Sequence, residues 1–338
     1  MEEVLGRELE YTRLGPLRVS VVGLGLWQAG SRLWGTKGSA RNWAFRVIEE
    51  ALEQGVNLYD TAEIYGWGES ERLLGQALKE AGTSGDVVVA TKVGGFRTTR
   101  YTILKAAQGS ARRLGRPPDI LQHHWPPPIH SRLCWVARGL EEAVERGLAH
   151  HVGLSNYPAR LLESILHCFH RLEPVSIQVQ YSLAYRSPEN KLIPLAHRRN
   201  MGVIAWSPLA KGALAGLRQA QTGAQKGDPV FREASRDEEL QEALEAVAKH
   251  YGATKAQVAL AWIIAKGAIP IPGTRRPERV REYSRASGIR LSKSDVDLLD
   301  KASARYLYRW GRTYKSLQWL RLIPSPLQYL AIRLAGGV

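Results

Sequence analysis

The sequence is poor in cysteine and has no long apolar run. Only Cys134 and Cys168 occur among 338 residues, and neither belongs to a CxxC pattern or a Cys/His ligand spacing. A disulfide framework, a structural zinc site and other metal sites are therefore not expected, and a reducing cytoplasm is the expected compartment. Nowhere do about 18 uncharged apolar residues follow one another, and the first residues, MEEVLGRELE, are acidic. We expect neither a transmembrane span nor a signal peptide.

Several nucleotide-binding and catalytic motifs are also missing. A dinucleotide site on an open doubly wound sheet requires G-x-G-x-x-G after the first strand, and here GLGLWQ places Gln28 where the third glycine belongs. No G-x-x-x-x-G-K-[ST] and no H-E-x-x-H occurs. The Rossmann, P-loop and zinc-protease interpretations therefore lose support.

Acidic residues are absent from the C-terminal end of a chain whose net charge is +15. Residues 301–338 contain seven basic and no acidic residues, so about half of the excess charge lies there. The remaining, moderately basic body is compatible with an anionic ligand, a nucleic acid, a membrane surface or solubility alone. The hydrophobic content of 44% is sufficient for a globular core.

Short runs rich in β-branched residues recur through the chain. Eight occur, with starts roughly 25 to 37 residues apart except for the last gap of about 66, and helical periodicity lies between them. In NWAFRVIEEALEQG, for example, the apolar residues share one face and the helix is expected to stop at Gly55. Eight strand-helix units predict one α/β domain, a (β/α)8 TIM barrel. The runs begin at Val19, Val56, Val87, Asp119, His150, Ser176, Gly202 and Ala268.

Two short extended pieces precede this repeat in LEYTRLGPLRVS, on either side of Gly15 and Pro16. This pattern predicts an N-terminal β-hairpin that closes the bottom of the barrel.

Polar or aromatic residues end six of the predicted strands. In a (β/α)8 barrel the functional side chains come from the C-terminal strand ends and the loops after them, so these residues are expected to meet at one mouth. They are Asp60, Lys92, His124, Asn156, Gln178 and Trp206.

The chemistry of the first strand ends suggests a proton donor. Asp60 and Lys92 come from neighbouring strands, and Tyr65 lies five residues after Asp60, close enough to lean over the mouth. A phenol near pKa 10 is a poor acid at neutral pH, but an ammonium within about 4 to 6 Å lowers its pKa. We expect Asp60 to orient Lys92, Tyr65 to donate a proton, and a histidine to steer a substrate carbonyl.

The doublet His123-His124 offers two candidates for that histidine. Successive strand side chains alternate faces, so both cannot point into the barrel. His124 shares its face with Gln122 and Ile120, which favours His124 as the inward residue and His123 as a packing residue.

Six segments resemble the aldo-keto reductase superfamily in order and spacing. They are NLYDTAEIYGWGESERLLG, VVATKVGG, DILQHHWPPP, VGLSNYP, AWSPLAKG and IPIPGTRRPERVRE, within about Leu9 to Leu299. Two of them look closer to general bacterial and archaeal members and to potassium-channel β subunits than to mammalian aldose reductases. The resemblance implies a barrel that binds NADP(H) without a Rossmann fold and reversibly reduces aldehydes and ketones by hydride transfer.

Carried over position by position, the resemblance implies a catalytic tetrad with Tyr65 as general acid, completed by Asp60, Lys92 and His124. Substrate contacts fall on Trp27, Tyr65, His124 and Trp125. Cofactor contacts fall on Gly25, Leu26, Trp27, Asp60, Ser155, Asn156, Gln178, Trp206, Ser207, Pro208, Leu209, Lys211, Gly212, Gly273, Thr274, Arg275, Arg279 and Glu282. Arginines before a helix N-terminus also suit a 2'-phosphate, which favours NADPH over NADH. Tyr283 departs from the usual asparagine, so stacking on adenine is expected there.

The residues after the resemblance form a basic, aromatic extension. We expect residues 1–300 to form the barrel and residues 301–338 an extension packed on it. At 100° per residue, Leu307, Trp310, Tyr314 and Leu317 lie opposite Arg305, Arg309 and Arg312, as in an amphipathic helix that Pro324 and Pro326 interrupt later. Peripheral membrane contact through residues 305–333 and a subunit interface remain alternatives.

Two functions remain open at this stage. The first is an NADPH-dependent carbonyl reductase of a small carbonyl substrate. The second is an NADP(H)-binding regulatory or redox-sensing subunit with low turnover, attached to a membrane through its tail. No nucleic-acid partner is expected, and both a monomer and a homo-oligomer are compatible with the sequence.

Overall fold

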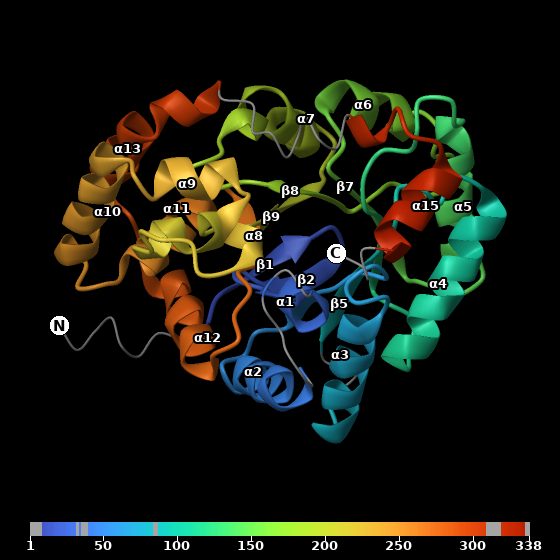
Figure 1. Ribbon diagram of the computed structural model, residues 1–338, viewed down its shortest axis with the longest axis horizontal. Helices are drawn as coiled ribbons and strands as arrows, with labels where there is room; N and C mark the ends of the chain where they lie inside the picture. The colour runs from blue at the N-terminus through green and yellow to red at the C-terminus, as the bar shows by residue number, and fades with distance from the viewer. Residues whose placement is uncertain (1–8, 32–33, 35–39, 84–86, 309–318, 335–338) are drawn as a thin grey trace.

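The computed structural model describes residues 9–31, 34, 40–83, 87–308 and 319–334. Eight parallel strands pair in chain order and curl into a barrel with helices outside it (Figure 1). They are β3 (Leu24–Gly25), β4 (Leu58–Asp60), β5 (Val88–Val93), β6 (Ile120–His123), β7 (His151–Ser155), β8 (Ser176–Gln180), β9 (Gly202–Trp206) and β10 (Ala268–Pro270). The predicted (β/α)8 fold is therefore confirmed.

Strands β3 and β10 stand at the two ends of this sheet. Two backbone hydrogen bonds join these ends, from the Gly23 amide to the Pro270 carbonyl at 2.9 Å and from the Gly25 amide to the Pro272 carbonyl at 3.1 Å. A Cβ atom at Gly25 would lie 2.8 Å from the Ile271 carbonyl oxygen, so only glycine permits this approach. The barrel closes through these contacts.

The helices lie outside the sheet and connect successive strands. Helix α2 buries Ala44, Val47, Ile48 and Ala51 on one face, as the periodicity predicts. The long β9–β10 connection holds a 3₁₀ helix and four α-helices, which explains the wide spacing before the last strand. The helices are α1 (Trp27–Gly30), α2 (Arg41–Glu53), α3 (Glu69–Glu80), α4 (Arg100–Leu114), α5 (Leu133–Glu145), α6 (Ala159–Leu166), η2 (Ser187–Asn190), α7 (Leu192–Arg198), η3 (Ala210–Ala215), α8 (Gly223–Lys226), α9 (Pro229–Ala234), α10 (Glu238–His250), α11 (Lys255–Ala265), α12 (Pro277–Ser284), η4 (Arg285–Gly288), α13 (Lys293–Ala302), η5 (Ala304–Leu307) and α15 (Ser325–Leu334).

The N-terminal hairpin, β1 (Tyr11–Leu14) and β2 (Leu17–Ser20), closes one end of the barrel. Leu14 and Val19 pack with inward residues of the barrel strands, including Ile120, Ile204 and Ile269. The hairpin is confirmed, but the prediction that the run at Val19 forms the first barrel strand is wrong. Val19 and Ser20 pair with β1, and the first barrel strand is β3, only two residues long.

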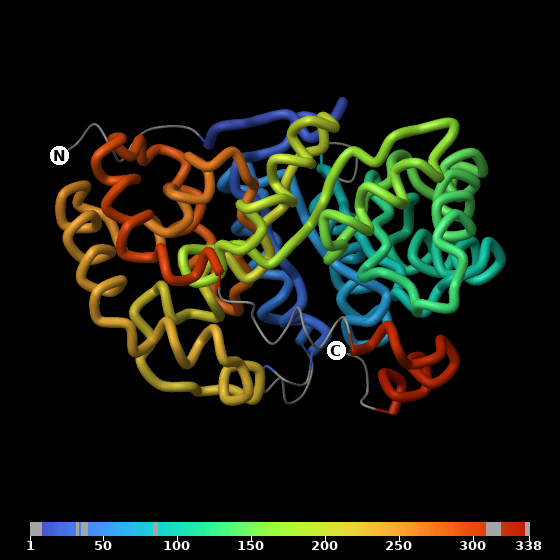
Figure 2. The backbone as a smooth tube through the Cα atoms, turned by 90° about the horizontal axis from the view of Figure 1, so that it is seen from above, coloured from blue at the N-terminus to red at the C-terminus, as the bar shows by residue number. Residues whose placement is uncertain are grey.

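Residues 319–334 lie at the opposite end of the barrel from the hairpin (Figure 2). The expected amphipathic helix falls largely on residues 309–318, outside the described residues, and the part before them is the short η5. Pro324 precedes α15 and Pro326 lies in its first turn, so these prolines begin a helix where an interruption was predicted. Among the described residues, no helix has the length and apolarity needed to cross a bilayer.

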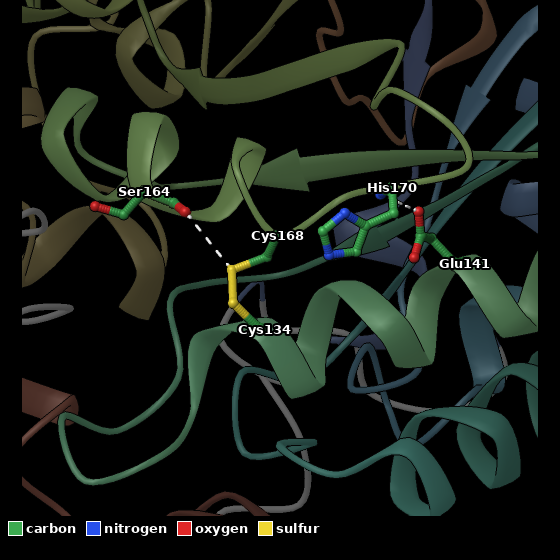
Figure 3. The surroundings of a disulfide bond; sticks show 5 residues. All are labelled: Cys134, Glu141, Ser164, Cys168 and His170. Atoms are coloured by element: carbon green, nitrogen blue, oxygen red, sulfur yellow. Dashed lines mark hydrogen bonds between the residues drawn. A yellow bond between two sulfur atoms is a disulfide. The ribbon is translucent and has the colours of Figure 1, made fainter.

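A disulfide joins Cys134 on α5 to Cys168 just after α6, with the two Cα atoms 4.8 Å apart (Figure 3). The expectation of two cysteines without a disulfide is therefore wrong. Spacing could not reveal the pair, because the contact depends on how two successive outer helices pack. Glu141 on α5 supports the same junction by accepting the backbone amides of His170 and Arg171, each at 2.7 Å.

Candidate active site

The C-terminal ends of the strands surround a cavity of about 700 Å³. Asp60 ends β4, Trp206 ends β9, and His124 directly follows β6. All three line the cavity, as do Asn156 after β7 and Gln178 in β8. The strand ends therefore meet at one mouth.

Lys92 on β5 lies just below this cavity with its side chain fully buried. Its Nζ donates to Asp60 Oδ2 at 2.6 Å, to the Thr61 carbonyl at 2.9 Å and to Tyr65 Oη at 3.3 Å. All three ammonium protons thus have acceptors, which compensates for burying the charge. The lysine is fixed in place with one N–H directed at the phenol.

Asp60 is held from its other side by two amides. Its Oδ1 accepts from Gln178 Nε2 at 2.7 Å and from Gln122 Nε2 at 3.3 Å. Since Oδ2 accepts from Lys92, both carboxylate oxygens have hydrogen-bond partners inside the barrel. The buried charge pair therefore has a fixed geometry.

The pKa of Tyr65 shows two opposing effects. Burial raises the pKa of the phenol, while the positive charge of Lys92 lowers it by a smaller amount, so the net direction is upward. Lys92 thus acts in the expected direction, but burial outweighs its effect on the Tyr65 pKa. Burial also opposes the charge on Lys92, but Asp60 and Tyr65 raise the pKa of the ammonium above its ordinary value. Tyr65 keeps its proton at neutral pH beside a charged lysine.

The two histidines take different environments. His124 lines the cavity, and its ring centroid lies 5.7 Å from that of Tyr65. Burial and the positive charge of Lys92 hold the pKa of His124 well below its ordinary value, so the ring is neutral. His123 points outward from the barrel, where its ring nitrogens lie 2.7 Å from Tyr157 Oη and 3.2 Å from the Arg97 carbonyl. The expected division of the doublet between two faces is observed.

Backbone strain accumulates at the same mouth. Asn156, Ser207 and Lys211 all have positive φ, between 53° and 60°, and all three line the cavity. Such conformations are costly for residues other than glycine and persist where surrounding contacts enforce them. Asn156 shows the enforcement, because its amide donates to the His124 carbonyl and its Oδ1 accepts from Trp206 Nε1 at 3.0 Å.

Lys211 takes partners that its position in the sequence did not reveal. Its Nζ lies 2.5 Å from Asp228 Oδ2 and donates to the Ala224 carbonyl at 2.9 Å. It also stands over the Trp27 ring, 5.5 Å from its centroid. Lys211 thereby ties the loop after β9 to the beginning of α9.

A basic segment borders the far end of the cavity. Thr274, Arg275 and Arg279 line it around the N-terminus of α12, where the Thr274 hydroxyl accepts the Arg276 amide. Tyr283 lines the same end, and burial, followed by the charge of Glu282, raises the pKa of its phenol to about 12. At this end of the cavity, arginine side chains and the uncharged phenol ring of Tyr283 line the same wall.

Most of the sequence-predicted site residues line the cavity, and four do not. The lining members are Gly25, Trp27, Asp60, Tyr65, His124, Trp125, Asn156, Gln178, Trp206, Ser207, Pro208, Leu209, Lys211, Gly212, Gly273, Thr274, Arg275 and Arg279. Lys92, Leu26 and Ser155 are buried behind the cavity wall. Glu282 faces away, pairing with Arg279 and accepting from Thr254 Oγ1 at 2.7 Å.

Sequence reasoning missed polar lining residues in the β9–β10 connection and just before α12. Among them are Thr222, Gln225, Asp228 and Arg276. The pattern TGAQ, a capping box that starts α8 at Thr222, and the Asp-Pro helix start at Asp228 were readable as helix signals, but not as cavity walls.

An aromatic and apolar cluster forms the outer wall. Trp125 is buried, and its Nε1 donates to Gln328 Oε1 on α15 at 3.2 Å. Tyr329 packs edge-on against Trp67 and Phe96, with centroid distances of 5.6 and 5.4 Å. The C-terminal helix is therefore part of the cavity's surroundings.

The fold and cavity define a (β/α)8-barrel protein with an enzyme-like site at the C-terminal strand ends. The model of the Aldo/keto reductase family matches residues 21–304. An uncharacterised oxidoreductase of Mycobacterium bovis is 37% identical over 302 residues, covering 86% of this chain and 91% of the relative. The chloroplastic pyridoxal reductase of Arabidopsis thaliana is 35% identical over 315 residues, covering 86% and 85%.

A solved structure extends these similarities. An aldo-keto reductase from Klebsiella pneumoniae, determined in complex with NADPH, has a TM-score of 0.72 at 26% identity, covering 89% of this chain and 96% of that one. This chain belongs to the aldo/keto reductase family, and its activity is that of an oxidoreductase.

Proposed function

We propose that the protein reversibly reduces aldehydes or ketones to alcohols with NADP(H), and that Tyr65 is the general acid. The contact between Lys92 Nζ and Tyr65 Oη, 3.3 Å at the wall of the cavity, carries this proposal. It places a protonated phenol beside a fixed positive charge, next to the neutral His124.

The proton step follows from these contacts. A substrate carbonyl oxygen at the phenol accepts the Tyr65 proton, and the phenolate that forms is stabilised by the Lys92 ammonium. Asp60 keeps the ammonium in place and charged. Neutral His124 positions the carbonyl by hydrogen bonding without competing for the proton.

The lining residues fit a nicotinamide dinucleotide. Ser207 Oγ is buried and has no hydrogen-bond partner among the described residues, as expected if a ligand group reaches the loop after β9. Trp206 offers a ring for stacking, and Thr274, Arg275 and Arg279 surround a helix N-terminus that suits a 2'-phosphate. Bound NADPH supplies a hydride to the carbonyl carbon.

The substrate end of the cavity suits an aromatic carbonyl compound. Trp27, Trp34 and Trp125 line it together with the apolar Leu320 and Ile332. Flat aromatic walls favour a flat substrate, because stacking adds to the burial of its apolar surface. The Arabidopsis relative, a pyridoxal reductase, is named for an aromatic aldehyde.

Steady-state oxidation of NADPH tests the reaction. Benzaldehydes, aliphatic aldehydes, diketones and quinones are supplied in turn, and we expect turnover with a lower KM for the aromatic members than for aliphatic aldehydes of equal size. Tight NADPH binding without turnover of any of them would contradict the proposal and favour the regulatory alternative.

A fluorescence titration tests the cofactor assignment separately. NADPH is expected to bind at least about tenfold more tightly than NADH, because charge-assisted contacts to the 2'-phosphate exist only for NADPH. Arg275→Gln should reduce this preference, while Arg198→Gln, an exposed arginine on α7, should leave it unchanged. Equal binding of NADPH and NADH by the unmodified protein would contradict the assignment of NADPH as the preferred cofactor.

A further inference from the structure

Residues 319–334, named here the C-terminal cover, have an inner face that packs on the barrel. Gln328 is completely buried and receives the Trp125 indole N–H. Tyr329 packs on the aromatic cluster, while Leu320 and Ile332 line the cavity. The contacts of the cover with the barrel thus lie on one side of it.

The outer face of the cover is apolar and exposed. Leu327, Leu330 and Leu334 follow one another at helical spacing on the solvent side of α15, with Leu334 80% exposed. Trp319, Leu322 and Ile323 extend this row before the helix, and Trp319 is 68% exposed. Contiguous exposed apolar residues of this kind mark interaction surfaces.

The neighbouring loop continues the same surface. The Ile129 amide donates to the Arg321 carbonyl at 2.9 Å, and the Ile129 side chain is 60% exposed. At the start of α5, Trp135 is also exposed, and the Arg132 guanidinium lies 5.1 Å from its ring centroid. Figure 1 shows α15 in front of α4 and α5. The cover and this loop form one apolar face edged by arginine.

The charge of this face is of a single sign. Arg333 on the cover and Arg132 and Arg138 beside it are exposed, and neither residues 319–334 nor residues 120–140 contain an acidic residue. A second copy bound through the same patch would bring two basic surfaces together without acidic partners for their arginines, which is unfavourable. An anionic lipid surface supplies the complement: phosphates for the arginines and an apolar interior for the leucines and tryptophans.

We propose that the outer face of the C-terminal cover docks on anionic membrane surfaces. Leucine side chains enter the boundary between headgroups and acyl chains, tryptophans lie at the interface, and arginines contact lipid phosphates. Because the cover also forms part of the cavity wall, docking brings the cavity close to lipid-dissolved carbonyl compounds. The membrane contact itself does not depend on the proposed reaction.

Co-sedimentation of the full chain with vesicles tests this docking. We expect binding to vesicles of phosphatidylcholine with 30 to 40 mol% phosphatidylglycerol, roughly tenfold or more above binding to pure phosphatidylcholine, and weakening with salt. Leu330→Ser should weaken binding about three- to tenfold, and Leu327→Ser/Leu330→Ser further. Leu298→Ser is the matched control, since Leu298 on α13 is 42% exposed, close to the 49% of Leu330.

Variants that remove arginine charges give a second test of membrane docking. Arg132→Gln/Arg333→Gln should lower binding to anionic vesicles about fivefold, while Arg198→Gln/Arg236→Gln, exposed arginines elsewhere, should change it less than twofold. Absence of binding to anionic vesicles, or equal effects of patch and control variants, would overturn the proposal. So would a patch variant that converts a dimer to a monomer in sedimentation velocity without changing vesicle binding. Thermal unfolding confirms that each variant is folded.

Discussion

The two ends of the barrel are built from the same strands but differ in chemistry. At the hairpin end, Leu14 and Val19 pack against the aliphatic side chains of barrel strands. At the mouth, Asp60 and Lys92 are buried as a charge pair and several residues have strained backbones. The hairpin end therefore contributes stability through apolar packing, while the mouth retains a buried charge pair and strained backbones, which are typical of functional sites.

The strongest test of this contrast is Lys92→Met. The change removes the positive charge beside Tyr65 and leaves the Asp60 carboxylate buried without its ion-pair partner. We expect kcat to fall by about 10³-fold or more. We also expect the free energy of unfolding to fall by about 3 to 5 kcal/mol. NADPH oxidation and chemical unfolding measure the two effects.

Lys266→Met is the matched control for that change. Lys266 pairs with Asp300 at 2.5 Å but is partly exposed, so removing it should change stability little. Its kcat should equal that of the unmodified protein. A similar loss of kcat and of unfolding free energy in both lysine variants would contradict the distinct role of Lys92 at the mouth.

The histidine doublet gives the next contrast, within two adjacent residues. His124→Ala should lower kcat about 10²-fold, because a group that orients the carbonyl is lost, with little change in stability. His123→Ala should leave kcat within about twofold and destabilise the fold by about 2 kcal/mol, since it breaks the buried contact with Tyr157 Oη. Exchange of these two outcomes would reverse the assignment of inner and outer faces.

At the hairpin end, Leu14→Ala should affect stability alone. Leu14 is fully buried, and its truncation leaves a cavity at the closed end of the barrel, costing about 2 to 5 kcal/mol. Because the mouth is at the other end, kcat should be unchanged. Urea unfolding and NADPH oxidation at a temperature where the variant is folded measure both; a large loss of kcat in folded protein would contradict the separation of the two ends.

The pH dependence of stability tests the burial of the two histidines. Burial lowers the pKa of His123 to about 4, so below pH 6.5 the unfolded chain takes up a proton before the folded chain does. Stability is then complete above pH 6.5 and is lost as the pH falls toward 4. His123→Gln should flatten this decline without abolishing it, because the pKa of His124 is lowered as well. An unchanged slope would contradict the buried neutral state of His123.

Much of the mouth was predictable because it depends on local periodicity. Strand ends gave Asp60, Lys92 and Trp206, and alternation of faces separated His123 from His124. The first barrel strand was not predictable in the same way, since a two-residue strand at Leu24 is too short for a pattern and the adjacent β-branched run belongs to the hairpin.

Features that depend on tertiary packing were beyond sequence reasoning. The Lys211–Asp228 pair bridges a loop and a later helix, and the Cys134–Cys168 disulfide bridges two outer helices. The direction of the Tyr65 pKa shift depended on the extent of burial, which composition does not reveal. The inward face of α15 became evident only from the contacts of Gln328.

The most direct measurement compares NADPH oxidation by Tyr65→Phe and Tyr59→Phe, using an aromatic aldehyde that the unmodified protein reduces. Both changes remove one buried phenolic hydroxyl, but that of Tyr59 donates to the Val56 carbonyl, away from the cavity. We predict that kcat falls by about 10² to 10⁴-fold in Tyr65→Phe and stays within about twofold in Tyr59→Phe. Equal kcat in Tyr65→Phe and the unmodified protein would contradict Tyr65 as the general acid.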